Sequence, residues 1–157
     1  MKTSFTKTTV RRNTGRFGEN RRGAACVELA ALSPILLLFL LGIIDVGQFI
    51  NLGQTVSNAS REGARIAARQ TTGNVSSVET AVANYLANLH PNIPASAVTT
   101  TVADGNATLS GGGINAVAEG SPVSVQVSVA YDSVRWIKGL PFLTGRSVTS
   151  STVARRE

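Results

Sequence analysis

A single long apolar stretch constrains this chain more than any other feature. Leu29–Ile44 contains sixteen residues without a charged side chain, and its extension back to Ala24 gives about twenty residues. A helix of that length can cross the hydrocarbon core of a bilayer. The stretch is apolar on every face and follows the basic pair Arg21 and Arg22, which argues against a buried helix of a water-soluble protein. The sequence therefore predicts one membrane-spanning helix near the N-terminus.

The net charge of +6 is confined to the first residues of the chain. Residues 1–22 contain seven basic side chains and one acid, whereas the remainder has eight of each and is neutral. Basic residues beside a membrane segment mark its cytoplasmic side. The basic segment has few aromatic residues between its basic residues and lies beside the membrane segment, so nucleic-acid binding is not expected. We expect residues 1–22 to form a disordered basic leader.

Residues that could carry catalysis or bind a cofactor are sparse. The single cysteine, Cys26, excludes an intramolecular disulfide. The single histidine, His90, has no cysteine or carboxylate at metal-ligand spacing and no accompanying nucleophile motif. Residues 110–113 are glycine-rich but lack the lysine and the strand–glycine–helix order of a phosphate loop. We therefore expect no enzymatic activity, no metal, no cofactor and no small-molecule substrate.

The apolar helix is expected to kink and then to continue outside the membrane. Pro34 removes a backbone hydrogen bond, which predicts a kink, and Ser33 is placed to satisfy the freed carbonyl groups. After Asp45 the helical pattern continues to about Arg69. Apolar and small residues recur there mostly at spacings of three and four, with Leu52 out of register: Val46, Phe49, Ile50, Val56, Ala59, Gly63, Ile66 and Ala67.

A group of charged residues lies on the outer half of this predicted helix. Arg61, Glu62, Arg65 and Arg69 are spaced about one turn apart, and the arginine pairs at i,i+4 repel each other. A solvated charged face is the simplest interpretation. A contact of Arg61, Glu62 and Arg65 with lipid headgroups, a partner subunit or the sheet remains open.

The rest of the chain predicts an α+β external domain. Ser76 and Glu79 form a capping box that opens a second helix over Ser77–Leu89, which His90-Pro91 ends. Four segments then have the patterns of short antiparallel strands, the first two joined by a turn at Asp104-Gly105-Asn106: 97–103, 107–109, 123–129 and 147–154. We expect this small sheet to pack against the outer half of the long helix.

The predicted organisation has four parts. Residues 1–23 form the leader, 24–45 the transmembrane segment, 46–70 the amphipathic continuation and 71–157 the external domain. Within that domain, Trp136, Phe142 and Leu143 lie in or beside an apolar loop. They could form an exposed binding patch, but packing in the core or loop is the favoured interpretation.

Several motifs at fixed spacing resemble the TadE-like family of the tight-adherence (Flp-type) pilus system. They cover about fifty residues and comprise Arg22-Gly23-Ala24-Ala25-Cys26-Val27-Glu28-Leu29-Ala30, then Pro34, Gly42–Gly47 and Asn58–Arg65. The family usually has a bulkier aliphatic residue at the position of Cys26. The C-terminal Thr-rich segment ending in Arg-Arg-Glu is a weaker similarity.

The resemblance implies that a prepilin peptidase cleaves between Gly23 and Ala24. Glu28 would then be the fifth mature residue, paired with the new N-terminal ammonium of a neighbouring subunit. An unpaired carboxylate near hydrocarbon is costly, and an added ammonium offsets part of that cost. Position alone also allows Glu28 to lie at the level of the headgroups, near Arg21 and Arg22.

The expected protein is thus a minor pilin or pseudopilin in the inner membrane, with a cytoplasmic N-terminus and an external C-terminal domain. Its partners would be the membrane, the prepilin peptidase, other pilus subunits and the tight-adherence secretion machinery. The alternative is an uncleaved, signal-anchored envelope binding module with a β-rich external domain. A secreted soluble protein is not expected, because the end of the apolar run offers no convincing signal-peptidase site.

Overall fold

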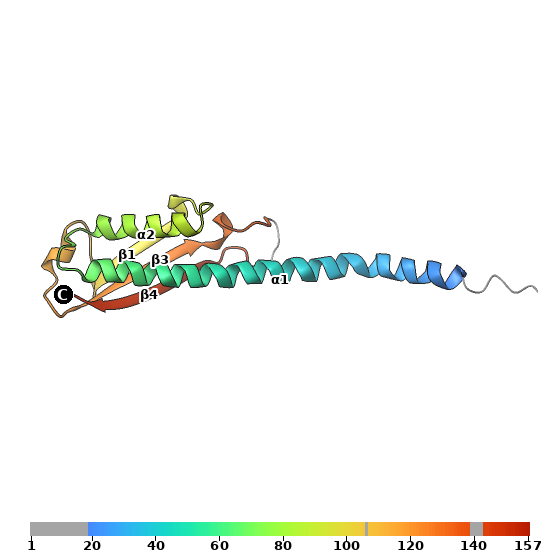
Figure 1. Ribbon diagram of the computed structural model, residues 1–157, viewed down its shortest axis with the longest axis horizontal. Coiled ribbons are helices and arrows are strands. Elements are labelled where there is room, and N and C mark those ends of the chain that lie inside the picture. The colour runs from blue at the N-terminus through green and yellow to red at the C-terminus, as the bar shows by residue number, and fades with distance from the viewer. Residues whose placement is uncertain (1–18, 106, 139–142) are drawn as a thin grey trace, which may run out of the picture. The chain divides into compact units, whose positions relative to one another are not determined.

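The computed structural model describes residues 19–105, 107–138 and 143–157, and the chain divides into two compact units. The first unit ends at Leu40 and the second comprises Leu41–Glu157. The long helix α1 contributes to both units, and the other elements belong to the second (Figure 1). In chain order the elements are α1 (Glu19–Ala68), α2 (Val75–Leu89), η1 (Ala95–Ala97), β1 (Val98–Asp104), β2 (Ala107–Thr108), η2 (Gly113–Ala116), β3 (Pro122–Ala130), η3 (Tyr131–Ser133) and β4 (Ser147–Arg155).

Helix α1 confirms the predicted long N-terminal helix and corrects its start. It begins at Glu19, so the prediction of a disordered leader is wrong for residues 19–22. Once a helix is nucleated, each added residue gains one backbone hydrogen bond, which allows the apolar helix to extend into polar sequence. The rest of the predicted leader, residues 1–18, lies outside the described residues.

The four strands form one antiparallel sheet in the order β2-β1-β3-β4. Strand β3 lies inside this sheet, and its alternating valines, Val123, Val125, Val127 and Val129, are buried on one face as the sequence predicts. The register places Val102 of β1 opposite Val125. Together with the two helices, this sheet confirms the predicted α+β class.

Helices α1 and α2 supply the other side of the hydrophobic core in the second unit, and both lie alongside the strands in Figure 1. Polar contacts also join α1 to the sheet. The Ser60 hydroxyl lies 3.2 Å from that of Ser150 and 2.8 Å from that of Thr152, both on β4. The C-terminal half of α1 is therefore part of the hydrophobic core of the second unit.

Gly63 allows α1 to approach two elements at once. A Cβ atom at this position would lie 2.8 Å from Cγ2 of Val82 on α2 and 3.0 Å from Cγ1 of Val125 on β3. Both distances are too short for a Cβ atom to fit. Because glycine has no side chain, α1 can pack this closely against α2 and β3.

The buried face of α1 differs from the predicted one. Leu52, which the sequence pattern placed out of register, is 3% exposed and belongs to the core. Val46 and Ile50, which were predicted to share that face, are exposed. With 100° between successive residues, the face through Asp45, Leu52 and Val56 leaves Val46 and Ile50 on the other side of the helix.

Helix α2 begins earlier than predicted. Its N-cap is Asn74, whose side chain accepts a hydrogen bond from the Ser76 backbone N–H at 3.2 Å, so the predicted capping box at Ser76 is wrong. The earlier start buries Val75 in line with the other core residues of α2, Val78, Val82 and Leu86. The helix ends at Leu89 as predicted, and the His90 N–H donates to the Leu86 carbonyl.

Arg156 caps the C-terminal end of α1. Its buried guanidinium lies between 3.0 and 3.5 Å from four carbonyl oxygens, those of Ala67, Arg69, Gln70 and Thr72. The last carbonyls of a helix have no partner within it, and a cation there also favours the helix dipole. The final residues of the chain therefore fasten β4 to the end of the helix on which the core is built.

We predict that Arg156→Ala lowers the free energy of unfolding by about 3 kcal/mol, because buried carbonyls lose a charged donor. The matched control is Arg155→Ala, which removes the neighbouring exposed arginine and is expected to change stability by less than about 0.5 kcal/mol. Denaturant unfolding of the full chain in detergent measures both variants. Equal stability of the two would contradict the capping role.

Candidate functional site

The N-terminal part of α1 presents apolar side chains on every face. Residues 23–40 are all exposed within the chain, apart from a half-buried Ser33. Helix α1 is the one helix, among the described residues, that is long and apolar enough to span a membrane. Apolar surface on all sides of a helix requires nonpolar surroundings supplied from outside the chain.

The predicted processing and assembly residues lie together on this helix. Gly23 is inside α1, and no atom lies within 4 Å of the position a Cβ would take there. Ala24 and Glu28 are four residues apart and therefore occupy the same helical face. Glu28 is an exposed carboxylate between the exposed side chains of Val27 and Leu29. In a nonpolar environment this carboxylate needs a partner that the first unit does not supply among its described side chains.

The helix continues through Pro34, and Ser33 compensates for the proline as predicted. Pro34 cannot donate to the carbonyl of Ala30, four residues earlier. The Ser33 hydroxyl donates to that same carbonyl at 3.0 Å. A kink at Pro34 stays a prediction.

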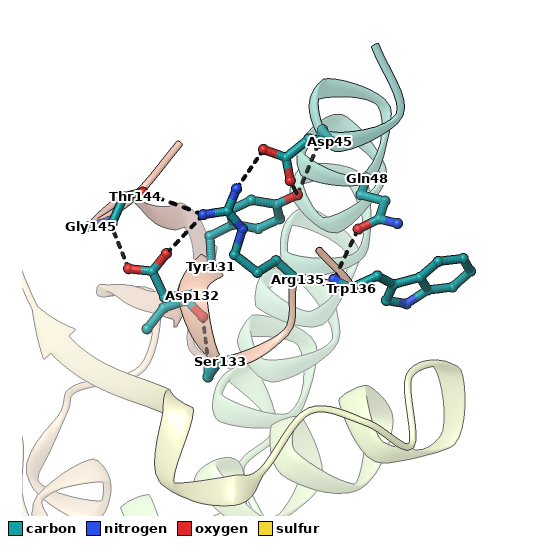
Figure 2. Close-up of polar contacts among 10 residues, drawn as sticks. Asp45, Gln48, Tyr131, Asp132, Ser133, Arg135, Trp136, Thr144 and Gly145 are labelled. Atoms are coloured by element: carbon teal, nitrogen blue, oxygen red, sulfur yellow. Dashed lines mark hydrogen bonds and ion pairs between the residues drawn. The ribbon is translucent and has the colours of Figure 1, made fainter. Parts of the chain in front are cut away.

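A buried ionic cluster forms in the second unit where the charge-free run ends. Asp45 is 1% exposed, and Nη2 of Arg135 lies 2.7 Å from its Oδ2. The Tyr131 hydroxyl lies 2.8 Å from Oδ1 and 2.9 Å from the carbonyl oxygen of Asp45 (Figure 2). A single turn of α1 is thereby held by two residues from the segment after β3.

Local structure places Tyr131 and Arg135 side by side. Tyr131 begins η3, and its carbonyl accepts from the Arg135 N–H at 3.0 Å. The guanidinium carbon of Arg135 lies 5.5 Å from the centre of the Tyr131 ring, a cation–π contact. Phe49 meets the same ring edge-on at 5.2 Å. Asp132 adds a longer ion pair to Arg135, with 3.6 Å between Oδ1 and Nη1.

Burial keeps the Tyr131 phenol protonated. Desolvation, the hydrogen bond to Asp45 and the Asp45 charge raise the pKa of Tyr131 to about 12, against the opposing effect of Arg135. The raised pKa means that the folded state favours the neutral phenol. The neutral phenol therefore contributes fully to the free energy of unfolding below pH 10, and this contribution is lost as the pH rises towards 12. Tyr131 therefore acts as a hydrogen-bond donor throughout the physiological range.

Sequence reasoning did not find this cluster. It took Asp45 as the end of the apolar run and as part of the motif Gly42–Gly47, without assigning it a partner, and did not single out Tyr131 or Arg135. The available signal was a carboxylate one helical turn before the apolar Phe49 on an amphipathic helix, since a carboxylate on a buried face requires a partner. The spacing of Tyr131 and Arg135, directly after the best-defined strand, was the second indication.

The charged group on the outer half of α1 contains one ion pair. Glu62 accepts from Arg65, with 2.8 Å between Oε2 and Nε, and this bond lowers the pKa of Glu62 despite some desolvation. Arg61 and Arg65 are exposed. An interaction through this face stays a prediction.

The favoured interpretation that Trp136 packs in the core or loop is wrong, because the residue is 78% exposed, as the alternative of an exposed patch requires. Leu143 packs against the core, and Phe142 lies outside the described residues. Nε2 of His90 lies 3.2 Å from the Thr55 hydroxyl. Among the described residues, no group of three potential metal ligands occurs.

Comparison with known proteins gives one match. Residues 23–65 match the family model of TadE-like proteins, which covers Gly23, Glu28, Pro34, Asp45 and Arg65. TadE-like proteins are structural pilus components and not an enzyme family. No curated protein matches the chain. No solved structure matches it either.

We predict that Asp45→Asn destabilises the second unit by about 3–5 kcal/mol, because Arg135 would keep a buried charge without its carboxylate. Replacing both residues, as Asp45→Leu with Arg135→Met, should recover much of that loss. Glu79→Gln, which neutralises an exposed carboxylate on α2, is the control. Denaturant unfolding of the full chain, followed by Trp136 fluorescence, measures each variant. An Asp45→Asn protein as stable as the control would contradict the prediction.

Proposed function

Because residues 23–65 form a TadE-like segment, we propose that this chain is a minor pilin or pseudopilin of a tight-adherence (Flp-type IVb) pilus. The observation that carries the proposal is the matched segment itself. Its membrane-length part, residues 24–44, is apolar on all faces and contains a single carboxylate, Glu28, five residues after Gly23. The role is structural, in assembly of the pilus, and requires no cofactor.

The charge distribution supports an orientation in the inner membrane. The basic leader, residues 1–23, stays cytoplasmic, and residues 24–45 span the bilayer. The second unit then lies outside the cytoplasm. Beyond the first few residues of that unit, the chain forms the amphipathic continuation over 46–70 and the external domain over 71–157.

Processing by a prepilin peptidase is supported by the surroundings of Gly23. The glycine is exposed, and no side chain from elsewhere in the described chain lies within 4 Å of the position a Cβ would take there, so none covers this turn of α1. Cleavage would leave a free ammonium on Ala24, one helical turn from Glu28.

Glu28 provides the assembly contact. Its carboxylate is exposed among apolar side chains, where an unpaired charge is unfavourable in hydrocarbon. The Ala24 ammonium of a neighbouring subunit would neutralise it during entry into the filament. The face formed by Arg61, Glu62 and Arg65 is a second contact, with other subunits or the tight-adherence secretion machinery.

We predict that Gly23→Leu blocks processing and leaves the full-length precursor in the membrane, because a leucine side chain does not fit a peptidase pocket that accepts glycine. The open space around Gly23 means that the chain itself tolerates the change. Gly47→Leu is the matched control, since Gly47 is also an exposed glycine of α1 with nothing near its Cβ position. Mass spectrometry of the membrane fraction compares the two. Unchanged processing in Gly23→Leu would place the cut elsewhere.

We predict that Glu28→Ala leaves membrane insertion intact and impairs pilus assembly, because the partner of the neighbouring ammonium is lost. Glu28→Asp, which keeps the charge on a shorter side chain, should retain part of the assembly. Alkaline extraction measures insertion, and electron microscopy of surface pili measures assembly. Normal piliation in Glu28→Ala would refute the assembly role.

A further inference from the structure

Trp136 is the most exposed large hydrophobic side chain among the described residues, and it is the only tryptophan of the chain. Leaving an indole in water is unfavourable, and such a side chain is typical of a contact surface. Neither the core of the second unit nor the proposed assembly contact at Glu28 uses it.

The position of Trp136 is fixed by its neighbours. Its backbone N–H donates to Oε1 of Gln48 on α1 at 3.4 Å. The preceding residue, Arg135, is buried and ion-paired with Asp45. Figure 2 shows the indole beyond Gln48, pointing away from the ionic cluster. The ionic cluster therefore holds the loop against α1 while the ring stays outside.

The contact on α1 sets the depth of the ring relative to the membrane segment. Gln48 follows the end of the charge-free run at Ile44 by four residues, or about 6 Å along the helix. That distance corresponds to the interface between the hydrocarbon core and the headgroups. Tryptophan is enriched at this depth because its ring is apolar and its N–H is polar.

The surroundings of Trp136 also suit a lipid interface. Ile43 and Val46, on the opposite face of the same stretch of α1 from Gln48, are also exposed and apolar, as expected where the helix meets lipid. Lys138 is exposed two residues after Trp136, where its ammonium can reach anionic headgroups. The one carboxylate of this stretch, Asp45, is buried against Arg135 and does not face the lipid.

We propose that Trp136 is a membrane-interface anchor, with its indole inserted at the headgroup level of the outer leaflet beside the exit of α1. The proposal rests on the membrane anchoring proposed above. The Asp45–Arg135 ion pair gives this anchor a rigid connection to the helix. The anchor fixes the depth and rotation of the external domain on the membrane surface before the subunit leaves it.

The test uses the single tryptophan as its own probe. Full-length protein is reconstituted into phosphatidylcholine vesicles whose acyl chains carry bromine either near the headgroup or near the chain end. Bromines near the headgroup should quench Trp136 fluorescence by more than about half, and those near the chain end less. Iodide added to the water should quench weakly.

The control is the double variant Trp136→Phe, Val153→Trp. Val153 is 64% exposed on β4, next to Thr152, which contacts Ser60 on α1. Ser60 is sixteen residues beyond Ile44, or about 24 Å along the helix, so a tryptophan at position 153 should lie in water. Iodide should quench this control strongly, and brominated lipid should not quench it.

Two results would overturn the inference. The first leaves the proposed membrane anchoring intact, and the second contradicts the anchoring as well. In the first, the protein resists alkaline extraction from the vesicles, but Trp136 fluorescence is quenched by iodide and not by brominated lipid, as in the control. The protein is then anchored in the membrane, and the proposed contact of Trp136 with the lipid interface is wrong. A protein subunit would then be the partner of the indole. If the protein is extracted, the membrane anchoring in the proposed function fails, and the interface anchor fails with it.

Discussion

The Asp45–Arg135 ion pair is the interaction on which the rest of the second unit depends. A carboxylate at the end of a membrane-length apolar run is costly to bury, and here an arginine ninety residues later neutralises it. The Tyr131 hydroxyl satisfies the remaining carboxylate oxygen. The cluster thereby ties the segment after β3 to the first turns of α1 within the second unit. It also holds Trp136 against Gln48, where the indole can meet the membrane surface.

A single helix contains the membrane-length apolar stretch and also contributes to the core of the second unit. Beyond Asp45 its inner face contacts α2 and the valines of β3, with Gly63 at the closest approach. Arg156 closes the far end by binding the carbonyl of Ala67, in the last turn of the helix, and that of Thr72, in the turn that follows. Both β4 and the ionic cluster are therefore attached to the part of α1 that lies in the second unit.

The elements with local, periodic signals could be predicted from the sequence. The apolar run, the alternating valines of β3 and the end of α2 at His90 gave the α+β class and the order of the elements. The contacts of Asp45 and Arg156 could not be predicted, because their partners lie more than eighty residues away in the chain. The assignment of Leu52 failed for another reason. Val46 and Ile50 are apolar although they are exposed, so the helical pattern near the membrane pointed to a false buried face. Position in the sequence made Gly23 and Glu28 candidates, and the structure adds that both are exposed on one helix.

The measurement that tests the proposed function most directly is the N-terminal sequence and intact mass of the protein from its native membrane fraction. A prepilin-type subunit starts at Ala24 and retains 134 of the 157 residues. That start would also make Glu28 the fifth residue, within one turn of a free ammonium. A protein that still starts at Met1 would contradict processing. It would leave a signal-anchored envelope protein whose external domain binds another partner.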